Sequence, residues 1–219
     1  SQLRPSPDLF EVRLDSLYPI LDHIAAAIRS LRAPLIITAR HPREGGSNNL
    51  SALRRATLLR QFLDCAAYID IELRARRELR SVQLQARRQH IGLIVSVHDF
   101  KATPSVSRLR ANTRAARAAG ADIFKVATRT DTREQLARLI GFFDEPDACR
   151  AVAGRRRNLP ISAMGIGKLG RVARVELARR GSVLIYAAIG RPRVEGQISL
   201  AQLRSALAAL KMDAGTDGL

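Results

Sequence analysis

The stretch Ala121-Asp122-Ile123-Phe124-Lys125-Val126-Ala127 is an apolar, β-branched run that predicts a buried strand. A helix-like stretch from Thr103 to about Ala119, closed by Gly120, precedes this run, and another near 131–143 follows it. Strands that alternate with helices of this length are typical of right-handed βαβ units in a parallel sheet. The stretch and its surroundings therefore predict an α/β fold.

The same alternation continues in both directions along the chain. We expect the other strands at 10–15, 34–40, 68–73, 91–98, 160–165 and 182–188, which makes seven βα units. Seven units are one short of a closed (β/α)8 barrel, and no linker or charge block divides them. No phosphate-binding glycine pattern follows the first strand, which disfavours a doubly wound open sheet. We therefore expect a single catalytic domain over residues 1–219, built as a TIM-type (β/α)8 barrel.

Composition narrows the class of protein. The chain has 219 residues, 46% of them hydrophobic, which is enough to bury the core of one domain. It contains no apolar run of about 18 residues or more and no apolar signal core near Ser1, so we expect a cytoplasmic protein that does not bind a membrane. Cys65 and Cys149 lie far apart without the spacing of metal ligands, and we expect no metal site.

The formal net charge of +17 raises the question of nucleic-acid binding. However, the arginines are spread over nearly every helix-like segment and are not gathered in one tail. Three tyrosines, six phenylalanines and no tryptophan leave few aromatic side chains on which bases could stack. We therefore expect no dedicated nucleic-acid site, although the charge would attract anionic substrates.

Lys125 is one of only four lysines, and it interrupts an apolar strand. Burial disfavours the charged form of a lysine, and the free amine is a nucleophile that condenses with carbonyls. A second apolar strand, residues 91–97, ends in His98 and Asp99. Each residue alone has a plain structural explanation, since a strand lysine can reach solvent and a histidine at a strand end is often only hydrogen-bonded. Together they suggest a Schiff-base enzyme with a histidine as proton carrier.

Several motifs accompany these two residues in a fixed order. They are Glu11-x-Arg13-x-Asp15, Thr38-x-Arg40-x-x-x-Glu44-Gly45-Gly46, Tyr68-Ile69-Asp70-Ile71-Glu72, Ser96-x-His98-Asp99-Phe100, Lys125-Val126-Ala127, Met164-Gly165 and Gly196-Gln197. With them, nearly the whole chain resembles the type I 3-dehydroquinate dehydratases. These are Schiff-base dehydratases of the shikimate pathway, which serves aromatic amino acid biosynthesis, and they fold as (β/α)8 barrels.

The resemblance implies a role for each matching residue. Lys125 would form an imine with 3-dehydroquinate, His98 would act as general acid and base, and Glu44 would orient the imidazole. The residues implied in substrate binding are Glu11, Arg13 and Arg40 for the ring hydroxyls and charge, Arg171 and Gln197 for the carboxylate, and Met164 and Tyr186 for an apolar wall. The resemblance also implies a homodimer without metal or organic cofactor. Asp70 and Glu72 are interpreted as members of a structural polar layer, without a role in the chemistry.

The chain departs from the family pattern at three places. Only residues 1–9 precede the first predicted strand, so the first βα unit of the barrel is expected to be absent or shortened. The loop that ends at Arg171 is one residue shorter than usual, which leaves Lys168 as an alternative partner for the carboxylate. Glu195 replaces the usual proline before Gly196 in the lid loop.

These departures leave two alternatives to the dehydratase. One is another Schiff-base enzyme of the class I aldolase kind, although the chain shows no evident glycine-rich phosphate nest near its last strands. The other is a degenerate homologue that keeps the lysine and histidine but has a binding or regulatory role.

Overall fold

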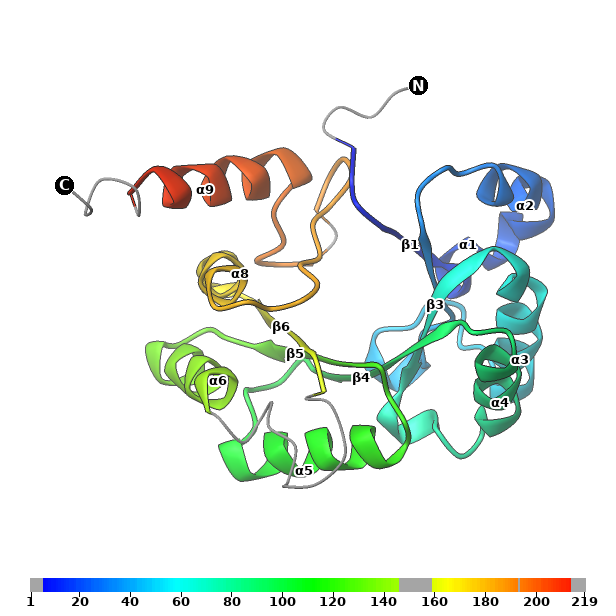
Figure 1. Cartoon of the computed structure of the whole chain (residues 1–219), viewed down its shortest axis with the longest axis horizontal. Coiled ribbons are helices and arrows are strands. Elements are labelled where there is room, and N and C mark those ends of the chain that lie inside the picture. The colour runs from blue at the N-terminus through cyan, green and yellow to red at the C-terminus, as the bar shows by residue number, and fades with distance from the viewer. Residues whose placement is uncertain (1–5, 146–158, 193, 214–219) are drawn as a thin grey trace. The chain divides into compact units, whose positions relative to one another are not determined.

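The computed structural model describes residues 6–145, 159–192 and 194–213 (Figure 1). The chain divides into two compact units. We call Pro7–His98 with Asn112–Lys125 the amino-terminal unit, and Asp99–Ala111 with the chain from Val126 onward the carboxy-terminal unit. Each unit is described by itself.

Six strands follow one another in chain order in a single sheet. They are β1 (Phe10–Arg13), β2 (Leu35–Thr38), β3 (Ala66–Glu72), β4 (Gly92–Asp99), β5 (Ile123–Arg129) and β6 (Ile161–Ile166). The pairs β1–β2, β2–β3 and β3–β4 are parallel, which confirms the predicted α/β class. All four residues of β2 and all six of β6 are buried, as expected of parallel strands covered on both faces.

The helices of the amino-terminal unit are short. They are α1 (Leu14–Leu17), α2 (Leu21–Arg29), α3 (Ala52–Gln61) and α4 (Arg80–Arg88), with 3-10 turns at Tyr18–Ile20, Pro42–Glu44, Leu63–Cys65 and Leu73–Ala75. Ser51 caps α3 by accepting a hydrogen bond from the Arg54 N–H, and α3 packs against α4 (Figure 1). The first strand was predicted to reach Asp15, but it ends at Arg13. Asp15 lies in α1, where its carboxylate accepts hydrogen bonds from backbone N–H groups of the loop after β2.

The carboxy-terminal unit holds α6 (Arg133–Asp144), α8 (Gly170–Arg179) and α9 (Leu200–Asp213), while α5 (Val106–Ala118) belongs partly to each unit. Helix α8 packs on β6 and contacts both α6 and α9 (Figure 1). A capping box of Thr132 and Gln135 begins α6. None of the helices within the described ranges is both long and apolar enough to cross a bilayer.

The seventh predicted strand, residues 182–188, is not formed. The segment begins beside β6, because the Val183 N–H donates to the Ile161 carbonyl at 3.1 Å. Farther along, the Tyr186 carbonyl accepts a hydrogen bond from the Arg174 side chain at 2.8 Å. This carbonyl thus bonds to a side chain and not to the backbone of a neighbouring strand. Only an isolated bridge between Ala188 and Ser199 follows. The apolar run correctly indicated a segment beside the sheet, but the prediction of a strand was wrong.

Candidate active site

Lys125 lies on β5 in the amino-terminal unit and is 3% exposed. Its Nζ atom is 2.9 Å from Asp70 Oδ2 on β3 and 3.3 Å from Glu11 Oε1 on β1. The Thr38 hydroxyl donates to the same Glu11 oxygen at 3.0 Å. The amine expected from the sequence is therefore buried, and it contacts carboxylates from two strands that are distant in the chain.

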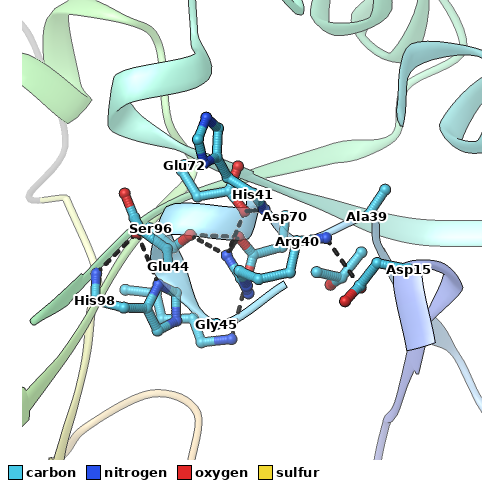
Figure 2. A network of polar contacts seen from close by, with 12 residues as sticks. Asp15, Ala39, Arg40, His41, Glu44, Gly45, Asp70, Glu72, Ser96 and His98 are labelled. Carbon is cyan, nitrogen blue, oxygen red and sulfur yellow. Dashed lines mark hydrogen bonds and ion pairs between the residues drawn. The ribbon is translucent and has the colours of Figure 1, made fainter. Parts of the chain in front are cut away.

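Arg40 lies at the centre of this charged cluster (Figure 2). Its guanidinium is 2.7 Å from Asp70, 3.0 Å from Glu72 and 3.6 Å from Glu11. It also donates to the Ser96 hydroxyl at 2.7 Å. Burial works against the charge, but the surrounding carboxylates hold the pKa of Arg40 well above its usual range.

The same ion pairs act on Asp70. Burial by itself would raise the pKa of this carboxyl group, but the positive charges of Arg40 and Lys125 hold it well below its usual range. The Ser96 hydroxyl adds a hydrogen bond to Asp70 at 2.6 Å. Asp70 is therefore an ionised carboxylate that joins the lysine to the arginine.

His98, at the end of β4, pairs with Glu44 (Figure 2). Glu44 Oε2 is 3.0 Å from His98 Nδ1 and accepts the His98 backbone N–H at 2.9 Å. Burial, together with the positive charges of Arg40 and Lys125, lowers the pKa of His98 well below its ordinary value. Burial, with the Glu72 carboxylate nearby, raises the pKa of Glu44 to about 7. Near neutral pH the imidazole is thus uncharged and able to accept a proton.

The protonation of Glu44 decides which imidazole nitrogen carries the hydrogen. An ionised Glu44 accepts the Nδ1–H of His98, so the hydrogen of the neutral ring is on Nδ1 and Nε2 is the basic nitrogen. A protonated Glu44 donates to Nδ1, so the hydrogen of the neutral ring moves to Nε2 and the base is lost. The pair therefore titrates as one unit, with Glu44 as the controlling group.

Arg13 and Asp15 hold the loop that carries Glu44. The Arg13 guanidinium pairs with the Asp15 carboxylate at 2.7 Å and donates to the Gly45 carbonyl at 3.0 Å. Gly45 has a φ of +82°, and a Cβ on Gly46 would lie 2.2 Å from the Arg40 carbonyl oxygen. The two glycines of the sequence motif are thus required by the backbone path that places Glu44 beside the histidine.

Sequence reasoning missed part of this cluster. Asp70 was interpreted as purely structural, yet it contacts the Lys125 amine directly. Arg55 of α3, which was not among the expected site residues, is buried, ion-paired with Glu72 and hydrogen-bonded to the Ala39 carbonyl at 2.7 Å. Asp70 and Glu72 are two residues apart on β3 and therefore lie on one face of the strand. Only the pairing of β3 with β2 and β4 shows which side chains this face contacts.

The other expected site residues belong to the carboxy-terminal unit. Met164 is buried on β6, and Tyr186 packs against the cluster of Ala127, Met164 and Ile166. Gln197 is half-buried. Arg171, by contrast, lies on the exposed side of α8, and the alternative Lys168 is exposed too. Neither of the two cations expected to bind the carboxylate is buried.

The lid segment around Gly196 is tied to its neighbours. The Glu195 carbonyl accepts the Gly167 N–H at 2.9 Å, and the Glu195 carboxylate pairs with Arg129 at 3.0 Å. A Cβ on Gly196 would lie 2.4 Å from the Gly167 carbonyl and 2.8 Å from Gly170 Cα. The glutamate that replaces the usual proline is thus accommodated by an ion pair.

The described residues contain no group of three or more histidine, cysteine or acidic side chains arranged to hold a metal ion. The reactive groups that they do offer are an amine, an imidazole and several carboxylates. Placed on neighbouring strands of a parallel sheet, these groups define an α/β enzyme with a buried lysine.

Comparisons with known proteins give the family. The sequence profile of the type I 3-dehydroquinases matches residues 1–214, so the chain belongs to that family. The chain is 34% identical to the 3-dehydroquinate dehydratase of Methanosarcina barkeri, over 83% of this chain and 76% of the relative. It is 33% identical to that of Methanothermobacter thermautotrophicus, over 93% and 85%.

Solved structures agree with this assignment. The 3-dehydroquinate dehydratase from Geobacillus kaustophilus superposes with a TM-score of 0.81 at 28% identity, covering 95% of this chain and 82% of that one. The structure from Enterococcus faecalis gives 0.74 at 25% identity, over 92% and 82%.

Proposed function

We propose that this chain dehydrates 3-dehydroquinate to 3-dehydroshikimate through a Schiff base on Lys125, with His98 as the general acid and base. Family membership supports the substrate and the reaction. The observation that carries the mechanism is the buried Lys125 amine within one charged cluster that also includes the His98–Glu44 pair.

In the proposed first step, the Lys125 amine attacks the C3 ketone and water leaves to give an iminium ion. The carboxylates in contact with the amine, Asp70 and Glu11, are the nearby acceptors for the proton that it must lose. The positive iminium nitrogen then withdraws electrons from C2, which makes the C2 proton far more acidic. The protein thus supplies the electron sink from its own side chain.

In the second step, neutral His98 takes the C2 proton through Nε2 and an enamine forms. The imidazolium then returns a proton to the C1 hydroxyl, which departs as water while the C1–C2 double bond forms. Hydrolysis of the product iminium consumes one water and regenerates the amine. Glu44 keeps the imidazole in the tautomer that this cycle requires.

Turnover is followed by the ultraviolet absorbance of the enone product, and the imine is trapped with borohydride. We expect a borohydride-stabilised adduct on Lys125 by mass spectrometry and loss of both adduct and turnover in Lys125→Ala. Lys101→Ala is the matched control, because Lys101 is exposed and lies outside the cluster. Turnover that survives Lys125→Ala would exclude the mechanism, and absence of turnover in the intact protein would favour the non-catalytic homologue.

We also propose that the fold is a TIM-type (β/α)8 barrel, that it forms a single catalytic domain and that it works as a cytoplasmic homodimer. The superposition on the Geobacillus kaustophilus enzyme supports the TIM-type fold. Sedimentation equilibrium tests the oligomeric state, since a homodimer has twice the chain mass of 24.1 kDa.

A further inference from the structure

Helix α3 carries an arginine on its buried face. Arg55 shares this face with Ala56, Leu58 and Leu59 and is 1% exposed, whereas the neighbouring Arg54 is exposed. The stripe of a helix that faces the core is ordinarily apolar, because a buried charge loses its hydration. Arg55 must therefore be stabilised by the groups that it contacts.

The contacts of Arg55 hold the backbone on both sides of Arg40. Its Nε donates to the Ala39 carbonyl at 2.7 Å, and its Nη2 pairs with the Glu72 carboxylate. The same carboxylate accepts the His41 N–H at 2.8 Å and pairs with the Arg40 guanidinium at 3.0 Å (Figure 2). This backbone follows the end of β2, and buried peptide groups outside a sheet need such side-chain partners. Arg55 and Glu72 together thus fix the peptide groups that flank Arg40.

The segment that Arg55 holds leads directly to Glu44. The 3-10 turn that follows this segment ends in Glu44, whose Oε2 is 3.0 Å from His98 Nδ1. All of these groups lie within the amino-terminal unit. A displacement of the backbone at residues 39–41 would therefore be passed on to the carboxylate that orients the imidazole.

Arg55 also supplies the second positive charge on Glu72. This carboxylate is fully buried and lies between the guanidiniums of Arg40 and Arg55. Burial, and then the negative charge of Glu72, raise the pKa of Glu44 to about 7. Arg55 offsets this negative charge, so it works against a further rise in the pKa of Glu44.

Other charged groups face the same pair. Those around Glu44 and His98 are Arg40 after β2, Asp70 and Glu72 of β3, Arg74 of the turn after β3, Arg13 of β1 and Lys125 of β5. Arg74 is half-exposed, so water screens its charge. Burial and the charge of Arg55 lower the pKa of His41, beside Glu72, so this ring is neutral near pH 7. Replacing Arg55 leaves all of these groups in the chain, so a change in pH dependence can be assigned to one buried charge.

We propose that Arg55 is a positioning residue of the active site: by neutralising Glu72 and holding the Ala39 carbonyl, it favours the ionised form of Glu44 and keeps this carboxylate aligned with His98. The assignment rests on the proposed function, because it concerns the pair that takes up and returns the proton. Arg55 acts on this pair through Glu72 and through the backbone.

The test measures kcat/KM for 3-dehydroquinate as a function of pH. Because Nε2 of His98 is the basic nitrogen only when Glu44 is ionised, kcat/KM should rise through the pKa of Glu44. Loss of the positive charge in Arg55→Met should raise this pKa, so the rise should move from about pH 7 to higher pH by roughly half a pH unit or more. Loss of the negative charge in Glu72→Gln should move the rise to lower pH, and the double variant Arg55→Met/Glu72→Gln should return it toward the pH of the intact protein.

The controls separate this role from a purely structural one, which would lower kcat/KM alike at every pH. Arg54→Gln removes an exposed charge from the same helix and should leave the rise unchanged. Arg55→Lys keeps the charge and should also keep the pH of the rise; a shift as large as in Arg55→Met contradicts the proposal. Unchanged pH dependence in Arg55→Met, or shifts of the same sign in Arg55→Met and Glu72→Gln, overturns it. If Arg55→Met does not fold, Glu72→Gln carries the test, and absence of its shift to lower pH overturns the proposal.

A measurement without turnover separates this proposal from the proposed function. Long-range proton–nitrogen NMR spectra of His98 report which ring nitrogen carries the hydrogen. In the intact protein the hydrogen should move from Nε2 to Nδ1 as the pH increases through the raised pKa of Glu44, about 7, and in Arg55→Met it should move at higher pH. If the intact protein has no turnover, the proposed function fails and these spectra decide: the same midpoint in both proteins overturns the role of Arg55.

Discussion

Glu44 sets the pH at which His98 acts as a base, because only the ionised carboxylate keeps the ring hydrogen on Nδ1 and makes Nε2 the basic nitrogen. The pKa of Glu44 is raised to about 7, so we expect kcat/KM to rise as the pH increases through about 7 and to level off above it. In Glu44→Gln, the amide oxygen still accepts the Nδ1–H of His98. The rise of kcat/KM with pH should then move down to the lowered pKa of His98, below 6.5. The pH profiles of kcat/KM for the intact protein and for Glu44→Gln measure these two effects. A rise at the same pH in both proteins would show that another group controls the base.

Asp70 neutralises Lys125 and Arg40 together, so its removal leaves two buried cations with fewer counter-charges. We expect Asp70→Asn to reduce the free energy of unfolding by about 3–5 kcal/mol, as for other broken buried ion pairs. Urea denaturation measures the change. Asp144→Asn is the matched control, because the Asp144–Arg180 pair is exposed and should cost about 1 kcal/mol or less. A similar small loss in both variants would mean that water screens the Asp70 cluster.

At the scale of the elements, the lid segment depends on close contact between glycines. Gly196 and Gly181 both have positive φ, +79° and +92°, but only Gly196 has backbone atoms within 3 Å of the position of a Cβ. Gly181→Ala should therefore cost about 1–2 kcal/mol of stability, from the backbone conformation alone. Gly196→Ala should cost clearly more, because the segments that carry Gly167 and Gly170 must also move. Denaturation curves of the two variants check this, and equal costs would show that the lid adjusts freely.

The helix α8 and the segment after it show how elements depend on each other. The Tyr186 carbonyl accepts a hydrogen bond from Arg174, and the Ser182 hydroxyl exchanges hydrogen bonds with Ala163 of β6. These side-chain contacts take the place of part of a strand ladder. A β-branched run therefore lies beside β6 without joining the sheet as a regular strand.

At the scale of the whole molecule, the net charge of +17 should act on an anionic substrate. Salt screens charges over about 10 Å at 0.1 M, so we expect kcat/KM for 3-dehydroquinate to fall as sodium chloride rises. The value of kcat should change little, since the buried cluster is screened much less. The methyl ester of the substrate is the control, and an equal salt effect on acid and ester would exclude long-range attraction.

The sequence by itself determined the strands β1 to β6 to within a few residues, because apolar runs and helix periodicity are local properties. It also singled out Lys125, His98 and Glu44 as candidate site residues, because they lie in strands or in family motifs. The six-stranded order follows from short βα connections, which leave few topologies open.

Only the tertiary structure decided which side chains these residues meet. Asp70 contacts Lys125 because β3 and β5 bring together positions 55 residues apart, a pairing that no local pattern encodes. Arg174 is buried in place of Arg171 because α8 packs on β6 with that face inward. Burial and charge pairing depend on segments that are distant in the chain, so the partners of the reactive groups were known only once the chain was folded.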